Sequence, residues 1–228
     1  MILAAGRGER MRPLTDTTPK PLLKVAGKML IEYHLENLAH AGITDVVINY
    51  AWLGERFPAA LGDGQAYGIN IVYSDESDSA LETAGGIVNA LDLLGVDPFI
   101  VVNGDIWTDY DYARLFNRRD HQPIHLVLVD NPAHHPQGDF GISNSGLVVE
   151  SDKEQLLTYS GIGVYSPEIF TKLEVGVHPL APLIREAIST QQVSGEHYQG
   201  QWWDIGTPAR LDELDKVLQN KNQGIKTR

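Results

Sequence analysis

The sequence predicts an α/β protein built on a doubly wound, mainly parallel (mixed) central sheet. Two observations carry this prediction. Short apolar runs alternate with amphipathic helical stretches over the first 130 residues. The run Phe99–Asn103 is also apolar almost throughout, as expected for a strand that helices cover on both faces. After residue 130 the pattern changes to short β-like pieces mixed with Gly and Ser, and two further helices.

The chain contains no low-complexity linker and no internal repeat, so we expect one domain over residues 1–228. Its first half, about residues 1–130, carries the alternating pattern. We expect its second half, about residues 131–219, to add one wall of a ligand-binding pocket whose other walls come from the first half. The polar residues 220–228 form a tail that we expect to fray.

The elements of the first half follow from the spacing of their apolar residues. Residues 29–41 form an amphipathic helix that Gly42 ends. Its predicted buried face consists of Leu30, Ile31, His34, Leu35 and Leu38. Apolar runs predict strands at 1–4, 45–50, 69–73, 99–103 and 124–129. Helical spacing predicts helices at 53–61 (interrupted by a proline), 85–94 and 110–119.

The second half contains fewer regular elements. Residues 147–150 and 157–165 have the composition of strands, and residues 180–188 have helical spacing. A last helix is predicted at 208–218, with Thr207 as its N-cap and Pro208 at its first position.

The composition excludes several classes of protein. The 228-residue chain has a formal net charge of −12, which argues against a nucleic-acid partner. No apolar run is long enough for a membrane span, and no signal-peptide pattern is present. The absence of cysteine excludes disulfides, thiolate catalysis and cysteine-bound metal. We therefore expect a cytoplasmic protein without a membrane partner, and a homo-oligomer stays open.

Basic residues gather near the N-terminus, where residues 1–28 hold six Lys and Arg against two acidic residues. The loop at 3–15 contains Gly6 and Gly8, and small residues there let backbone N–H groups approach a phosphate. Arg10 adds a fork of donors that matches phosphate oxygens, and Lys20 adds a charge between two prolines. The combination indicates an anion site, with chance surface charge as the alternative.

Two aspartates follow predicted strands. Asp105 comes after the apolar strand that ends at Asn103, and Asp204 precedes the last helix. Ligands of open α/β sheets bind outside the carboxyl ends of the strands, and Mg²⁺ prefers carboxylate, phosphate and water oxygens. Each aspartate has a structural alternative as a cap or a strand end. Together with the basic loop, the pair indicates a nucleotide-phosphate site that contains magnesium.

Three motifs carry a resemblance to a known family. The run 3–35, LAAGRGERMRPLTDTTPKPLLKVAGKMLIEYHL, resembles the opening signature of the sugar-1-phosphate nucleotidyltransferases. VNGD at 102–105 and the W-x-D-I-G-T motif at 202–207 are similar to the family's two metal-aspartate motifs. The resemblance implies a Rossmann-like nucleotide-diphospho-sugar transferase fold, with a nucleotide-binding first half and a sugar-binding second half. It also implies an enzyme in which a sugar phosphate attacks the α-phosphorus of a nucleoside triphosphate and pyrophosphate leaves.

The resemblance also implies roles for individual residues. Such a transfer needs positioning and charge neutralisation rather than a protein nucleophile. The implied catalytic residues are Arg10, Lys20 and Asp105. Asp105 and Asp204 are the implied ligands of Mg²⁺. The nucleotide-binding residues implied are Leu3, Ala4, Ala5, Gly6, Arg7, Gly8, Lys20, Glu76, Glu82, Thr83 and Gly85, of which Gly85 has an equally weighted alternative as a packing glycine. The implied sugar-binding residues are Asn103, Asp139, Gly141 and Gly161.

Within the family, the segments 135–141, 157–165, 178–187 and 194–208 most resemble the N-acetylmuramate 1-phosphate uridylyltransferases of peptidoglycan recycling. This resemblance implies UTP and N-acetylmuramic acid 1-phosphate as substrates. Mannose-1-phosphate guanylyltransferase or another hexose-1-phosphate nucleotidyltransferase is the alternative. An inactive nucleotide-sugar-binding regulatory subunit is an alternative of another class. A dinucleotide-binding dehydrogenase is disfavoured because Met11 stands where its third glycine is needed.

Two features depart from the family pattern. Many members place a lysine of a Glu-Lys-Pro motif on the sugar phosphate, and Lys153 in the corresponding region does not match that motif. The group that holds the sugar phosphate is therefore open. The chain also begins only two residues before Leu3, so we expect either a truncated first strand or a start further upstream.

Overall fold

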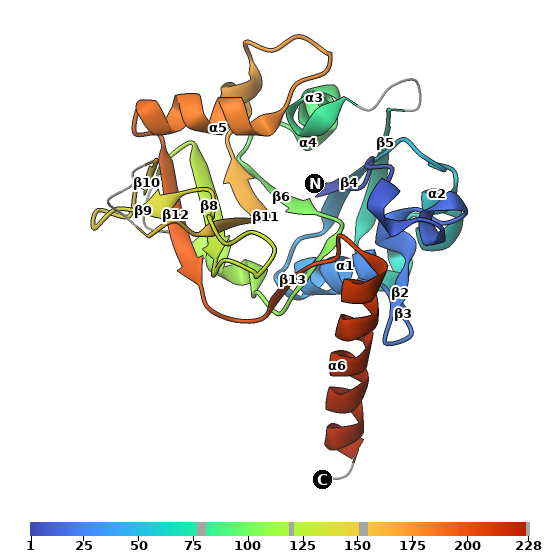
Figure 1. Cartoon of the computed structure of the whole chain (residues 1–228). Coiled ribbons are helices and arrows are strands. Elements are labelled where there is room, and N and C mark those ends of the chain that lie inside the picture. The colour runs from blue at the N-terminus through green and yellow to red at the C-terminus, as the bar shows by residue number, and fades with distance from the viewer. Residues whose placement is uncertain (77–80, 119–120, 151–154, 227–228) are drawn as a thin grey trace.

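The computed structural model describes the chain except residues 77–80, 119–120, 151–154 and 227–228. Its centre is a seven-stranded sheet in the order β12-β8-β11-β6-β1-β4-β5 (Figure 1). β11 runs antiparallel to both of its neighbours, and the other neighbouring pairs are parallel. The predicted mainly parallel, mixed sheet is therefore confirmed. The strands are β1 (Ile2–Leu3), β4 (Asp45–Tyr50), β5 (Asn70–Asp75), β6 (Phe99–Asn103), β8 (Ile124–Val129), β11 (Thr158–Tyr165) and β12 (Val193–Tyr198).

Helices cover both faces of the sheet, because its central strands are apolar on both sides. Along β6, Ile100 and Val102 face the core beneath α1 and α2, whereas Phe99 and Val101 face the core beneath α3 and α5. Figure 1 shows α3, α4 and α5 on one side of the sheet and α1 on the other. The helices are α1 (Leu30–His40), α2 (Arg56–Leu61), α3 (Glu82–Asn89), α4 (Leu91–Leu94), α5 (Leu180–Ser189) and α6 (Pro208–Lys226).

Three two-stranded sheets and six 3₁₀ helices complete the fold of the described residues. β13 pairs with β7, β2 with β3, and β10 with β9, each pair antiparallel. No helix among the described residues combines the length and the apolar character that a membrane span needs. The additional strands are β2 (Lys24–Val25), β3 (Lys28–Met29), β7 (Ile106–Thr108), β9 (Gly141–Ile142), β10 (Val148–Val149) and β13 (Trp202–Asp204). The 3₁₀ helices are η1 (Glu9–Met11), η2 (Leu14–Asp16), η3 (Lys20–Leu22), η4 (Gln65–Tyr67), η5 (Tyr112–Asn117) and η6 (Pro167–Phe170).

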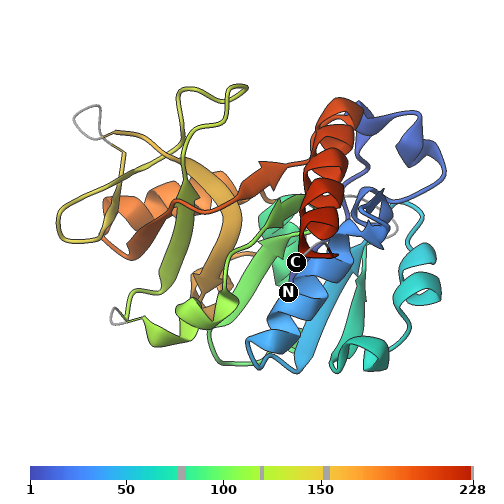
Figure 2. The same ribbon diagram turned by 90° about the horizontal axis from the view of Figure 1, so that it is seen from below.

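The C-terminal helix α6 crosses back onto the first half of the chain. Figure 2 shows it beside α1. Leu211 and Leu214 of α6 share an apolar cluster with Met11, Leu30 and Trp107. The end of the chain is thereby joined to the N-terminal loop and to β7.

Most predicted elements are confirmed. The five side chains expected to be buried on the helix at 29–41 are the five buried on α1. The strands predicted at 45–50, 99–103 and 124–129 have those bounds. Pro58 lies in the first turn of α2, where an N–H has no acceptor within the helix, so it does not interrupt the helix.

Two predictions are wrong. The helix predicted at 85–94 is two helices, because the Asn89 side chain donates to Ser74 and Asp75 of β5 and the helix is interrupted at Ala90. The helix predicted at 110–119 is the shorter 3₁₀ helix η5. It begins after Asp111, because the Asp111 side chain caps it by accepting from the backbone N–H of Ala113. The last helix is longer than predicted, since α6 continues to Lys226, and the fraying expected of residues 220–228 stays a prediction.

A buried histidine connects α1 to β7. The Nε2 atom of His34 lies 2.9 Å from the carbonyl oxygen of Ile106, and its Nδ1 lies 2.9 Å from the Tyr112 hydroxyl. Since a carbonyl only accepts, Nε2 carries the hydrogen and Nδ1 accepts from Tyr112. Burial lowers the pKa of His34 from 6.5 to about 4, against a smaller opposing effect of the Ile106 hydrogen bond and of Asp105. The neutral ring therefore anchors the segment that follows Asp105.

This pKa predicts a loss of stability in acid. Between pH 6.5 and about pH 4 the unfolded chain binds a proton at His34 that the folded chain does not bind. The contribution of His34 is complete above pH 6.5 and falls by about 3 kcal/mol as the pH drops through this window. Urea unfolding of the wild type and of His34→Gln at pH 7.5, 6, 5 and 4.5 measures it. The variant should lose less stability than the wild type on acidification, and parallel pH profiles would contradict the assignment.

Candidate functional site

Two adjoining cavities lie at the carboxyl ends of the central parallel strands. The first, of about 560 Å³, opens beyond β1, β4 and β6, and the second, of about 370 Å³, lies toward β11 and β13. Arg10, Asn103 and Asp105 line both cavities and so mark their junction. The first is lined by Leu3, Ala4, Ala5, Gly6, Gly8, Glu9, Arg10, Met11, Lys20, Pro21, Asn49, Glu76, Leu81, Glu82, Thr83, Asn103, Asp105 and Gly206. The second is lined by Arg10, Asn103, Asp105, Ile106, Pro132, His134, His135, Thr158, Tyr159, Ser160, Trp202 and Asp204.

The glycine loop folds back on itself at Gly8. This residue has φ +67°, and a Cβ atom there would lie 3.0 Å from Thr15 and 3.3 Å from Lys20. Thr15 Oγ1 donates to the Gly8 carbonyl at 2.8 Å and holds the turn closed. A larger residue at position 8 would therefore be strained and would displace Lys20, so glycine is required for the shape of this wall.

A buried amide and carboxylate form the opposite wall. Asn49 Oδ1 accepts from the backbone N–H of Ala4 at 2.8 Å, and Asn49 Nδ2 donates to Glu76 Oε1 at 2.7 Å. Burial raises the pKa of Glu76, while the hydrogen bonds from Asn49 and Leu81 oppose the rise. Gly86 packs against this pair, since a Cβ atom at that position would lie 2.5 Å from Glu76 Oε1. The pair connects the ends of β1, β4 and β5 to α3.

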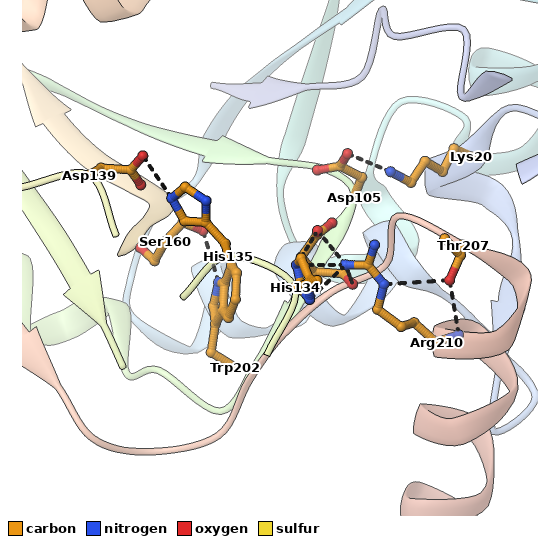
Figure 3. A network of polar contacts seen from close by, with 10 residues as sticks. Lys20, Asp105, His134, His135, Asp139, Ser160, Trp202, Thr207 and Arg210 are labelled. Carbon is orange, nitrogen blue, oxygen red and sulfur yellow. Dashed lines mark hydrogen bonds and ion pairs between the residues drawn. The ribbon is translucent and has the colours of Figure 1, made fainter. Parts of the chain in front are cut away.

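Lys20 and Asp105 meet at the junction of the cavities. Lys20 Nζ lies 2.6 Å from Asp105 Oδ2, and the lysine side chain is only 8% exposed, against 40% for the aspartate (Figure 3). Asp105 therefore offers its carboxylate to the cavity while a largely buried cation balances its charge. Arg10 lines both cavities and makes no hydrogen bond or ion pair to any residue that the structure describes. Its guanidinium is thus available to a ligand.

Asp204 reaches the second cavity on β13. Its neighbour Ile205 donates to the backbone carbonyl of Asp105 at 3.0 Å, so the two aspartates lie on adjoining segments. Arg210 Nη1 donates to Asp204 Oδ2 at 2.6 Å and to its backbone oxygen at 3.1 Å. His134 Nε2 lies 3.2 Å from the same carboxylate oxygen. Thr207 Oγ1 accepts from Arg210 N, which confirms Thr207 as the cap of α6.

The rest of the second cavity is built on β11. A register shift after Tyr159 leaves Gly161 at φ +81°, and a Cβ atom there would clash with Asn103. Trp202 Nε1 donates to the carbonyl of Ser160 at 2.9 Å, which fixes the indole as a wall of the cavity (Figure 3). The side chain of Asn103, the last residue of β6, therefore packs against Gly161 near the start of β11.

The structure brings together most of the site residues predicted from the sequence. Five of them line neither cavity among the described residues: Arg7, Gly85, Asp139, Gly141 and Gly161. The Arg7 guanidinium instead stacks 3.6 Å above the ring of Trp52. Gly85 donates to the carbonyl of His178 and packs against Gly176, in agreement with its alternative role in packing. Lys153 lies outside the described residues.

Sequence reasoning missed several residues of the walls. Asn49 stands at the carboxyl end of β4, so the rule that ligands meet strand ends could have found it. His134, His135 and Arg210 carried no such signal, because their positions depend on how a loop and a helix from distant parts of the chain meet Asp204 and Asp139.

The donor atoms at the junction suit a hard divalent cation. No group of three or more His, Asp or Glu side chains in the described part of the chain could hold a metal by itself. Asp105 and Asp204 nevertheless line one cavity, and Mg²⁺ commonly takes one or two carboxylates and completes its shell with substrate phosphates and water. The two carboxylates fit a metal that arrives with a phosphate ligand.

Comparison with known proteins agrees with this geometry. The family described as "Nucleotidyl transferase" matches residues 1–221. The chain is 54% identical to the N-acetylmuramate alpha-1-phosphate uridylyltransferase of Neisseria meningitidis serogroup B, over 95% of this chain and 96% of that protein. It is 36% identical to the protein of the same name from Caulobacter vibrioides, over 91% of each chain. The crystal structure of HddC from Yersinia pseudotuberculosis aligns with a TM-score of 0.80 at 21% identity, over 95% of this chain and 97% of that one, which shows the same fold.

The buried pair Asn49 and Glu76 allows a test by exchange. Asn49→Asp removes the donor to Glu76 and buries a second carboxylate beside it, so we expect a loss of about 3 kcal/mol in the free energy of unfolding. The double variant Asn49→Asp with Glu76→Gln restores one donor and one carboxylate and should regain most of the loss. Urea denaturation at pH 7 measures both. A double variant no more stable than the single one would show that the two side chains are not coupled.

Proposed function

The chain belongs to the nucleotidyl transferase family, and on this premise we propose that it transfers a uridylyl group from UTP to N-acetylmuramate 1-phosphate. The products are UDP-N-acetylmuramate and pyrophosphate. The observation that carries the proposal is the meeting of Arg10, Lys20 and Asp105 at the junction of two cavities. The 54% identity over nearly the whole length of both chains supports the choice of substrates.

UTP occupies the first cavity in this proposal. The loop from Leu3 to Gly8 follows the β1 strand end, where small residues let backbone N–H groups approach the nucleotide. Thr83 and the Asn49–Glu76 pair lie on the wall where the base would be recognised. An amide and a carboxylate in fixed hydrogen bonds can distinguish donors from acceptors on a base edge, which supports base selection at this wall.

N-acetylmuramate 1-phosphate occupies the second cavity, with its phosphate toward the junction. The Trp202 indole offers an apolar wall to the sugar ring, and Asn103 offers both a donor and an acceptor to its hydroxyls. Arg10 contacts the phosphate groups from the junction, where it has no protein partner. We therefore assign to Arg10 the binding of the sugar phosphate, the role that a lysine of the Glu-Lys-Pro motif has in many family members.

The reaction needs no protein nucleophile. An oxygen of the sugar phosphate forms a bond to the α-phosphorus of UTP, and the bond from that phosphorus to the bridging oxygen of the β-phosphate breaks. Mg²⁺ held by Asp105 and Asp204 would supply charge neutralisation at the phosphate oxygens. Lys20 fixes the Asp105 carboxylate by an ion pair, and Arg210 does the same for Asp204. The attacking oxygen is ionised at neutral pH, so no general base is required.

The product, UDP-N-acetylmuramate, is consistent with a role in the reuse of cell-wall sugars, as in peptidoglycan recycling. The nucleoside triphosphate substrate favours a cytoplasmic location for the enzyme. An inactive regulatory subunit is the alternative of another class. It is disfavoured because an inactive relative would be expected to lose a carboxylate or a basic residue, and Arg10, Lys20, Asp105 and Asp204 are all present.

The proposed function is tested by pyrophosphate release over a matrix of substrates. Four nucleoside triphosphates are combined with the 1-phosphates of N-acetylmuramate, N-acetylglucosamine, mannose and glucose. We expect the highest kcat/KM for UTP with N-acetylmuramate 1-phosphate. A higher value for GTP with mannose 1-phosphate would replace the substrate assignment by the guanylyl alternative, and no release with any pair would favour the regulatory subunit.

Asp105→Asn removes the charge that the site presents to the metal and phosphates. We expect kcat to fall by about 100-fold or more while the folded structure persists, because 40% of the side chain is exposed and no apolar core is disturbed. Steady-state kinetics and circular dichroism measure the two quantities. The matched control is Asp130→Asn, an exposed aspartate paired with His197 outside both cavities, which should retain wild-type turnover.

Removal of divalent cations should abolish the activity, and Mg²⁺ should restore it. In Asp204→Asn we expect the Mg²⁺ concentration for half-maximal rate to rise by about tenfold or more, since one of two carboxylate ligands is lost. Titration of the chelator-treated protein with Mg²⁺ measures this. Full activity in the presence of excess chelator would contradict the assignment of both aspartates.

A further inference from the structure

A histidine of the second cavity, His135, pairs with an aspartate behind the cavity wall, Asp139. Figure 3 shows His135 and Asp139 at a distance from Asp105 and Lys20. His135 lines the cavity, and its Nε2 lies 3.1 Å from Asp139 Oδ1. Asp139 Oδ2 accepts from the backbone N–H of Tyr159 at 2.8 Å. Both oxygens of Asp139 are occupied by protein donors, so this residue orients His135 from behind.

The second nitrogen of His135 is left for a ligand. Because a carboxylate only accepts hydrogen bonds, Nε2 carries a hydrogen and points to Asp139. Within the described ranges, Nδ1 has no hydrogen-bond partner. When Nδ1 also carries a hydrogen it can donate to an anion, and the Asp139 carboxylate beside Nε2 balances the charge of the ring. The pair can therefore present a positively charged donor to the cavity.

The other basic groups of this cavity are committed to its phosphate end. Arg10 lies at the junction with the first cavity, and His134 contacts Asp204 and Arg210. Among the described lining residues, His135 is thus the basic side chain that remains for an anionic group elsewhere on the sugar. A neutral sugar would leave this donor without a charged partner.

We propose that His135, oriented by Asp139, binds the lactyl carboxylate of N-acetylmuramate 1-phosphate. The second cavity thereby contains a carboxylate subsite in addition to its phosphate end, and this inference rests on the proposed function. N-acetylmuramate differs from N-acetylglucosamine by a lactyl ether on O3, which carries the carboxylate. C3 is separated from the phosphorylated C1 by C2, so the lactyl group leaves the ring away from the anomeric phosphate.

The subsite makes the enzyme choose between two otherwise similar sugars. A site that donates to a charged group loses that interaction completely when the group is missing, and its own donor is then left unpaired. Asp139 acts as a positioning residue, because it touches His135 and the backbone of β11 rather than the sugar. Asp139 accepts from the His135 ring, and its bond to the backbone N–H of Tyr159 fixes that ring relative to the cavity wall.

The test compares two sugar phosphates in the wild type and in His135→Gln. The quantity measured is the ratio of kcat/KM for N-acetylmuramate 1-phosphate to that for N-acetylglucosamine 1-phosphate, with UTP saturating. We expect the ratio to fall by roughly 10- to 100-fold in the variant, the range that loss of a hydrogen bond to a charged group gives. The change should reside in KM for N-acetylmuramate 1-phosphate, because the carboxylate is remote from the reacting phosphorus.

Three further variants separate the charge from the fold. His135→Arg keeps a cationic donor and should retain more of the preference than His135→Gln. Asp139→Asn keeps an acceptor for Tyr159 but loses the charge, and should lower the ratio by an intermediate factor. The matched control is His197→Gln, which removes the exposed histidine paired with Asp130 at 2.8 Å outside both cavities and should leave the ratio at the wild-type value.

The outcomes distinguish the inference from the proposed function. A lower ratio in His135→Gln with partial retention in His135→Arg supports the carboxylate subsite. An unchanged ratio, or an equal loss for both sugars, would overturn the subsite while a wild type that prefers N-acetylmuramate 1-phosphate keeps the proposed function intact. A wild type without that preference would overturn the proposed substrate itself, and the subsite with it.

Discussion

The pairing of β13 with β7 is the constraint on which the site depends. Asp105 directly precedes β7 and Asp204 ends β13, so the antiparallel register sets the two carboxylates on adjoining segments although 98 residues separate them in the chain. The start of β7 is held from two sides. His34 holds Ile106 from α1, and the cluster of Trp107 with Leu211 and Leu214 holds β7 against α6. The last helix is therefore part of the support of the site.

Each of the two carboxylates that line the second cavity has its own cation. Lys20 reaches Asp105 from η3, and Arg210 reaches Asp204 from the first turn of α6. Both cations are largely shielded from water, at 8% and 19% side-chain exposure, so solvent screens these ion pairs less than it screens surface pairs. Since both aspartates are already balanced, the free charge of Arg10 is available to whatever anion enters.

The sequence predicted the fold well, and it named most of the residues that line the two cavities, because both depend on local patterns. Apolar spacing located α1 and β6, and small residues after a strand located the loop that ends at Gly8. It could not predict how long-range contacts change a local pattern. The helix at 85–94 is divided because Asn89 bonds to β5, and the roles of Asp139 and Arg7 depend on partners in other segments, His135 and Trp52.

The antiparallel direction of β11 explains why the second cavity is harder to locate from the sequence than the first. The rule for open sheets points to carboxyl ends, and β1, β4 and β6 obey it. Because β11 runs the other way, its beginning, Thr158–Ser160, lies at the same edge of the sheet. The register shift that follows Tyr159 brings Gly161 against Asn103, where a side chain would not fit. A reversed strand with an irregularity at its start thus adds the second cavity to the edge that the parallel strands define.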